Sequence, residues 1–179
     1  EKNATKFFQP EQLKVFPPVP GDQVRPDQIN TTVDEVFVPA AMLPQAAEIL
    51  ADQDGNVLME QGNGYSSEGN DRTAHAERIL ASRAAKAYSV EFLATCTLYT
   101  SAEPCAMCSG AIYWAGIGRV VFGQTEHDLK LQTGDHQENP TLDLPCHIVF
   151  AAGQRPTEII GPLLADEAAT LQAEFWSKR

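Results

Sequence analysis

The sequence predicts an α/β protein, a three-layer α/β/α sandwich with a mixed sheet of about five strands. Strand-like segments alternate with segments of helical spacing along most of the chain. The first two strand-like segments are separated by a short glycine-containing turn, which predicts an antiparallel hairpin. With 179 residues, the chain is long enough for one domain with a sizeable core.

The N-terminal region contains no clear strand or helix. Residues 1–26 include five prolines and few periodic apolar positions, so we expect an extended arm there. The remainder, residues 27–179, is expected to form a single domain. A helix over residues 27–43 is suggested by apolar residues at helical spacing, although Pro39 opposes it.

The hairpin is predicted over residues 46–51 and 56–61, and a polar loop follows it. The later elements are expected in this order: a helix over 74–88, a strand over 94–99, a helix over 104–115, a strand over 119–123, a short helix at the start of 125–139, a helical turn over 146–152, a strand over 157–161 and a closing helix over 165–176. Thr73 is the expected N-cap of the first helix, and Pro104 is expected at the first position of the second.

Two short motifs carry side chains that bind zinc, namely His75-Ala76-Glu77 and Pro104-Cys105-Ala106-Met107-Cys108. Cys105 and Cys108 are spaced to share one face of a helix, whose N-terminus favours the thiolate form that zinc binds. One imidazole and two thiolates leave the fourth tetrahedral position for water, as in hydrolytic zinc sites. We therefore predict one catalytic Zn²⁺ per subunit held by His75, Cys105 and Cys108, with Glu77 uncoordinated as the general acid and base.

Other interpretations of these motifs stay open. Cys-x-x-Cys alone is also typical of redox pairs and of structural zinc sites. A structural zinc would need a fourth ligand, and neither Cys96, Cys146 nor the remaining histidines stand at ligand spacing. His-x-Glu followed by Pro-Cys-x-x-Cys is the signature of zinc deaminases, which favours the catalytic interpretation. Cys96 and Cys146 are then expected to be buried packing residues.

The charge and the composition of the chain limit the classes of molecule that we expect it to bind. The formal net charge of −11 disfavours nucleic acids and favours small neutral substrates. Arg78, Arg83 and Lys86 cluster in sequence, and they are expected on the solvent face of a helix. The chain has no apolar run long enough to cross a membrane and no disulfide framework among its four cysteines, so we expect a reducing, cytoplasmic location.

From about residue 44 to residue 176, the chain resembles the cytidine deaminase superfamily, which are zinc hydrolases of nucleobases and nucleosides. Residues 70–77 and 103–112 are similar to tRNA adenosine deaminases and bacterial guanine deaminases, and the continuation 112–115 is more similar to the guanine deaminases. The resemblance implies a cytidine deaminase-like fold, a homodimer, and conversion of guanine to xanthine and ammonia. Deamination of tRNA adenosine, cytosine or a nucleoside is the alternative, and a non-catalytic zinc-stabilised domain is the second alternative.

The resemblance also implies a set of residues that contact the substrate. Asn63 would bind the base through its amide, Ala76 would lie against the base, and Trp114 would line the base pocket. An aromatic residue on an apolar helix more often packs in the core, so that interpretation of Trp114 stays open. Glu138, or Asp135 in its place, would supply an additional acidic contact.

Two aromatic residues near the C-terminus, Phe175 and Trp176, are candidates to cap the pocket of the same or a neighbouring subunit. We expect them to pack in the core instead.

Overall fold

The computed structural model describes residues 47–134, 136–137 and 139–177. The arm predicted over residues 1–26 and the helix predicted over residues 27–43 lie outside this part of the chain. The candidate substrate residues Asp135 and Glu138 lie outside it as well.

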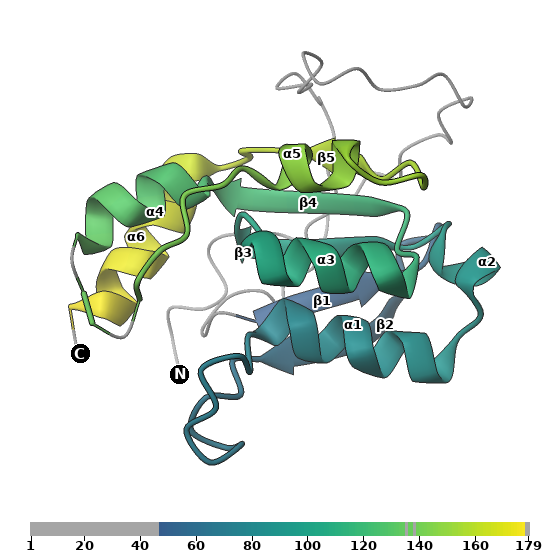
Figure 1. Ribbon diagram of the computed structural model, residues 1–179, viewed down its shortest axis with the longest axis horizontal. Helices are drawn as coiled ribbons and strands as arrows, with labels where there is room; N and C mark the ends of the chain where they lie inside the picture. The colour runs from purple at the N-terminus through teal and green to yellow at the C-terminus, as the bar shows by residue number, and fades with distance from the viewer. Residues whose placement is uncertain (1–46, 135, 138, 178–179) are drawn as a thin grey trace.

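The described chain forms a five-stranded mixed sheet with helices packed against it, as the sequence predicts (Figure 1). In chain order the elements are β1 (Ala47–Ala51), β2 (Val57–Gly62), α1 (Ala76–Ala87), α2 (Val90–Leu93), β3 (Thr97–Ala102), α3 (Ala106–Ala115), β4 (Arg119–Gln124), α4 (Glu126–Thr133), α5 (Cys146–Ala151), β5 (Glu158–Ile160) and α6 (Ala165–Trp176).

The strands lie in the order β2-β1-β3-β4-β5. β1 pairs antiparallel with β2 and with β3, whereas β3, β4 and β5 run parallel to one another. Asp52 shapes the predicted hairpin turn, because its side chain accepts hydrogen bonds from the backbone N–H groups of Asp54 and Asn56, at 2.9 Å each. The parallel strands require crossover connections, which α3 and the later helices supply.

The two faces of the sheet bury different side chains. One face packs against α1, α3 and α5, which lie side by side in front of the sheet in Figure 1. Leu50, Leu80 and Ile112 are fully buried in this layer. The opposite face buries Ile49, Val121 and their neighbours, and α6 packs against β4. Because side chains alternate along a strand, Ile49 and Leu50 enter opposite layers.

Several predicted boundaries are wrong. Thr73 is not the N-cap of α1, because His75 is the N-cap residue and the Thr73 hydroxyl donates to Asp71 instead. Pro104 precedes α3, whose N-cap is Cys105. The strand expected over residues 94–99 begins at Thr97 and runs to Ala102, because the short helix α2 is capped by Ser89 and ends just before it.

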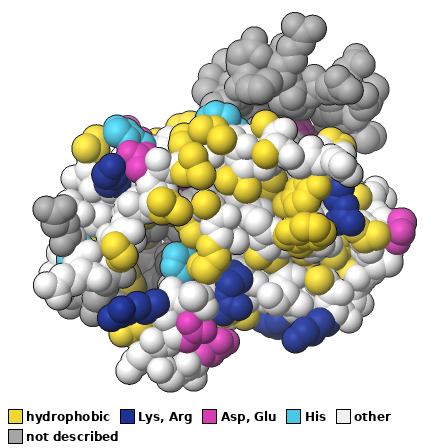
Figure 2. Space-filling view, viewed as in Figure 1, with side chains coloured by type: hydrophobic (Ala, Val, Ile, Leu, Met, Phe, Trp, Pro, Cys, Tyr) yellow, Lys and Arg dark blue, Asp and Glu magenta, His cyan; other side chains and the backbone are white. Residues whose placement is uncertain are grey.

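The surface on the α1, α3 and α5 side carries hydrophobic side chains over the helices and a hollow beside them (Figure 2). Of the basic residues of α1, Arg83 and Lys86 are exposed, as expected, and Arg78 is half-buried. Within the described ranges, no helix combines the length and the apolar character needed to cross a membrane.

Candidate active site

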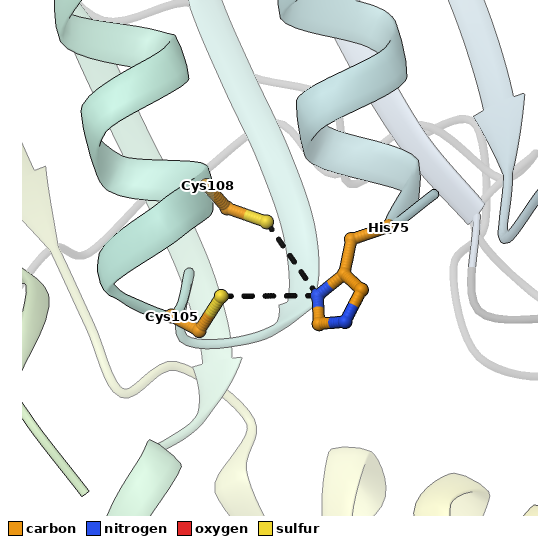
Figure 3. A group of neighbouring side chains, drawn as sticks. All are labelled: His75, Cys105 and Cys108. Carbon is orange, nitrogen blue, oxygen red and sulfur yellow. Dashed lines mark hydrogen bonds between the residues drawn. The ribbon is translucent and has the colours of Figure 1, made fainter. Parts of the chain in front are cut away.

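The two zinc-competent motifs meet where α1 and α3 begin. α1 packs beside α3 on the same face of the sheet, and both helices start at the same end of it (Figure 1). His75 has an extended backbone conformation as N-cap of α1, and Cys105 has one as N-cap of α3. Cys108 lies in the first turn of α3 and is fully buried. The two helix starts therefore direct an imidazole and two thiols toward one point (Figure 3).

The spacing of these three side chains fits a tetrahedral metal. The Nδ1 atom of His75 lies 3.8 Å from the sulfur of Cys105 and 3.6 Å from that of Cys108. Zinc bonds of about 2.0–2.1 Å to nitrogen and about 2.3 Å to sulfur, at a tetrahedral angle, separate such atoms by about 3.6 Å. All three ligand atoms lie within 4.8 Å of one another, and no other His, Cys, Asp or Glu in the described ranges joins the group. The donor set thus fits zinc and leaves one coordination position for a small molecule.

Without a metal, the two cysteines shift each other's pKa in opposite directions. A hydrogen bond from Cys108 lowers the pKa of Cys105 to about 4, and the same hydrogen bond raises the pKa of Cys108. The hydrogen bond to Cys105 also raises the pKa of His75. A divalent cation at this point would displace these protons, because it binds thiolates and neutral imidazole.

Glu77 lies beside the three-residue group without being part of it. Its side chain is 8% exposed, and its Oε2 atom accepts a hydrogen bond from the Cys108 thiol at 3.5 Å. Burial raises the pKa of Glu77. A buried carboxyl with a raised pKa, next to an open metal position, is suited to take up and release a proton.

A cavity of about 320 Å³ opens above this group, close to the lower end of the usual range for small-molecule sites, about 300–1,000 Å³. The predicted substrate residues Asn63 and Ala76 line it. Asn63 uses its side-chain oxygen locally, because it accepts from the backbone N–H of Tyr65 at 2.9 Å. Phe175 and Trp176 also line the cavity, so the expectation that they pack in the core is wrong.

Trp114 lies away from this cavity. It sits near the C-terminal end of α3 and is 77% exposed, so it neither lines the cavity of its own chain nor packs in the core. The metal group is at the other end of α3, where the helix begins. Cys96 and Cys146, by contrast, are buried as expected, at 1% and 0% exposure.

Three buried acidic residues that the sequence patterns did not single out also line the cavity, namely Glu48, Glu103 and Glu126. Glu103 accepts hydrogen bonds from the backbone N–H groups of Glu126, at 3.0 Å, and Cys146, at 2.7 Å. Burial raises the pKa of Glu126 to about 8, and burial together with the nearby charge of Glu77 raises the pKa of Glu48. One signal was available for Glu48, since it is an acid inside the apolar strand sequence Ala-Glu-Ile-Leu-Ala.

Known proteins are similar to this chain in sequence and in fold. The sequence profile of the cytidine and deoxycytidylate deaminase zinc-binding region matches residues 35–124. A probable cytosine deaminase of Schizosaccharomyces pombe is 40% identical over 128 residues, which cover 72% of this chain and 76% of the relative. The guanine deaminase of Bacillus subtilis is 43% identical over 82 residues, covering 46% of this chain and about half, 51%, of that enzyme.

The fold is similar to the solved structure of a guanine deaminase from Nitrosomonas europaea. The TM-score is 0.57 at 26% sequence identity, and the similarity covers 73% of this chain and 72% of that one. The profile match to half of the chain and the extended similarity to the S. pombe relative agree with the three-ligand group and the five-stranded sheet. The chain therefore belongs to the cytidine and deoxycytidylate deaminase family of zinc-binding deaminases.

Proposed function

We propose that the protein is a zinc-dependent hydrolase that deaminates a free nucleobase, with guanine as the first candidate substrate and xanthine and ammonia as products. One observation carries this proposal. His75, Cys105 and Cys108 converge on one point with no fourth ligand from the described residues, and the uncoordinated carboxyl of Glu77 lies beside them. This arrangement suits hydrolysis better than structural zinc, which takes four protein ligands.

His75, Cys105 and Cys108 would hold one Zn²⁺ per subunit. Bound there, the ion would act as a Lewis acid and lower the pKa of water, so that hydroxide would be available as a nucleophile near neutral pH. Glu77 accepts a proton from the attacking water and transfers it to the ring nitrogen next to the carbon under attack. A second proton then reaches the exocyclic amine, which departs as ammonia while the ring carbon keeps the oxygen. The buried position of Glu77 favours this role, because its raised pKa allows it to carry the proton between steps.

The lining of the cavity favours a substrate without phosphate. Five carboxyl side chains line it, those of Glu48, Asp71, Glu77, Glu103 and Glu126, and Arg72 is the one lysine or arginine among the described lining residues. An anionic phosphate would face repulsion from these carboxyls and would find few cations. The net charge of −11 of the whole chain adds to the repulsion of a phosphate. A free base is therefore favoured over a nucleotide or a tRNA.

Guanine is the first candidate for two reasons. Buried carboxyls accept hydrogen bonds, and guanine carries N–H donors on its ring and on its amino group. Similar solved structures, with a TM-score of 0.58 and 27% identity, contain 8-azaguanine. Cytosine is the second candidate, because the S. pombe relative is described as a probable cytosine deaminase and is similar over 72% of this chain.

The substrate contacts follow from the walls of the cavity. We propose that Asn63 and Ala76 contact the base, and that Phe175 and Trp176 cover it with aromatic surface. We also propose a homodimer, in which the exposed Trp114 would meet a second chain instead of a base in its own cavity. The acidic contact assigned to Glu138 stays a prediction.

The test is an ammonia-release screen with the zinc-loaded full chain. The substrates are guanine, guanosine, cytosine, adenine and a tRNA anticodon stem-loop. Guanine should give the highest kcat/KM, with xanthine identified as the product, and guanosine should be much slower. The screen contradicts the proposal if zinc binds in a 1:1 ratio and no free base releases ammonia, or if the RNA is the preferred substrate.

A further inference from the structure

Glu48 places a carboxyl group in an unusual position on strand β1. The neighbouring residues Ile49 and Leu50 are fully buried in the two opposite core layers. Because side chains alternate along the strand, Glu48 shares its face with Leu50, the face that packs against α1 and α3. A glutamate therefore occupies a position on the interior face of the sheet, beside the cavity.

The hydrogen bonds of Glu48 are incomplete within the described chain. Its side chain is only 4% exposed, and its Oε2 atom has no hydrogen-bond partner. The neighbouring ionisable group is another carboxyl, that of Glu77, which cannot compensate its charge. Leaving a buried carboxyl oxygen without a partner is costly, and none of the described residues supplies one, so a molecule that enters the cavity would give this oxygen a favourable contact.

Glu103 lines the same cavity as Glu48, but both of its carboxyl oxygens are used in hydrogen bonds within the chain. Both Glu103 oxygens accept backbone N–H groups, one from Glu126 and one from Cys146. They are therefore engaged in holding the chain together. Glu48 keeps an oxygen for a ligand.

We propose that Glu48 is a specificity-determining residue, whose Oε2 atom accepts a hydrogen bond from an N–H group of the bound base other than the amine that leaves. The inference rests on the proposed function, since it names the class of base that the same cavity takes. An ionised carboxyl is acceptor-only, and a protonated one keeps an acceptor oxygen. Glu48 therefore selects heterocycles with a second amino or ring N–H group beside the reacting amidine, and it disfavours bases that present only acceptors there.

The test measures binding of 2,6-diaminopurine and 2-aminopurine, which share the C2 amine that would leave and differ by one further amino group. Both are titrated calorimetrically into the zinc-loaded full chain in the Glu77→Gln background, so that neither base is consumed. The parent should bind 2,6-diaminopurine at least about tenfold more tightly, and Glu48→Leu should abolish this preference while changing the 2-aminopurine Kd less than about threefold. A preference that persists in Glu48→Leu, or its absence in the parent, overturns the inference.

Two further variants control for folding and charge. Glu60→Gln removes an exposed carboxyl from the adjacent strand β2, and it should keep the full preference. Glu48→Leu replaces a buried carboxyl by an apolar group of similar size, so its thermal unfolding without ligand should occur at the parental temperature or above. If this variant does not fold, Glu48→Met serves instead, because it keeps a side chain of similar length and carries no carboxyl oxygen. An undiminished preference in Glu48→Met overturns the inference.

Ammonia release by the wild-type chain separates this inference from the proposed function. A preference that depends on Glu48, without ammonia release from any base, supports the inference and contradicts the deaminase proposal. Ammonia release with a preference that ignores Glu48 contradicts the inference alone. Failure to bind either base contradicts both.

Discussion

Glu103 should contribute more to stability than any exposed acid of this chain. It is 5% exposed, and its two oxygens accept backbone N–H groups at the start of α4 and at the start of α5. Glu103→Ala leaves both donors buried without a partner. A hydrogen bond to a charged group contributes about 1.5–3 kcal/mol, so the loss should be about 3–6 kcal/mol. This is a large fraction of the roughly 5–15 kcal/mol that stabilises a typical domain.

Urea unfolding followed by circular dichroism measures this loss. The free energy of unfolding of Glu103→Ala should fall by the stated amount, which corresponds to a decrease in Tm of about 6–24 °C for a chain of this size. Glu103→Gln keeps one acceptor oxygen and should lose about half as much. Glu68→Gln, which changes an exposed loop residue, is the matched control and should stay within about 0.5 kcal/mol of wild type. A loss below about 1 kcal/mol in Glu103→Ala would refute the reasoning.

Three further predictions concern the site itself. Glu77→Gln should lower kcat by about 10²–10⁴-fold with zinc content unchanged, because the amide cannot carry a proton; near-normal turnover in steady-state assays would exclude the proton-transfer role. Cys105→Ser should lose zinc, measured by atomic absorption, and it should unfold at a lower temperature than the zinc-loaded wild type; full zinc occupancy would contradict its role as a ligand. In the metal-free protein, the raised pKa of Glu126, about 8, means that the native state holds a proton that the unfolded state releases above the ordinary value of 4.5. The free energy of unfolding should therefore fall between pH 4.5 and pH 8, less steeply in Glu126→Gln; equal slopes for both proteins would exclude this contribution.

The zinc-competent group could be predicted because its signal is local. His75 stands in one short motif, and Cys105 and Cys108 stand in the other. Each motif lies at the start of a helix, α1 or α3, and these two helices pack side by side. The strand order after residue 46 also follows from short-range patterns, as does the helix order apart from the short helix α2, and the five-stranded mixed sheet is confirmed.

The details of the helix starts could not be predicted by the same means. Thr73 has the residue type of an N-cap, but its hydroxyl and its backbone N–H bind Asp71. His75 and Cys105 take the N-cap positions although neither side chain caps its helix. The extended backbone at each position directs the side chain away from its helix and toward the other motif. Tertiary placement of the metal-site residues thus prevails over capping preference.

The acidic wall of the cavity depends on contacts between distant segments. Glu48 belongs to the first strand and lies near Glu77, which belongs to the first helix. Whether a glutamate in a strand faces the cavity or the solvent depends on the register of that strand, which the sequence of one strand does not fix. Trp114 illustrates the converse, since its position in an apolar helix suggested burial whereas the side chain is exposed.

The central claim is that three protein ligands hold zinc and that Glu77 stays outside its coordination sphere. A crystal structure of the zinc-loaded full chain, with an anomalous map at the zinc absorption edge, tests it most directly. The predicted result is one zinc ion bonded to His75 Nδ1 and to the sulfurs of Cys105 and Cys108, with a water molecule as fourth ligand and Glu77 hydrogen-bonded to that water. A zinc ion bonded directly to Glu77, or one with a fourth protein ligand, would contradict it.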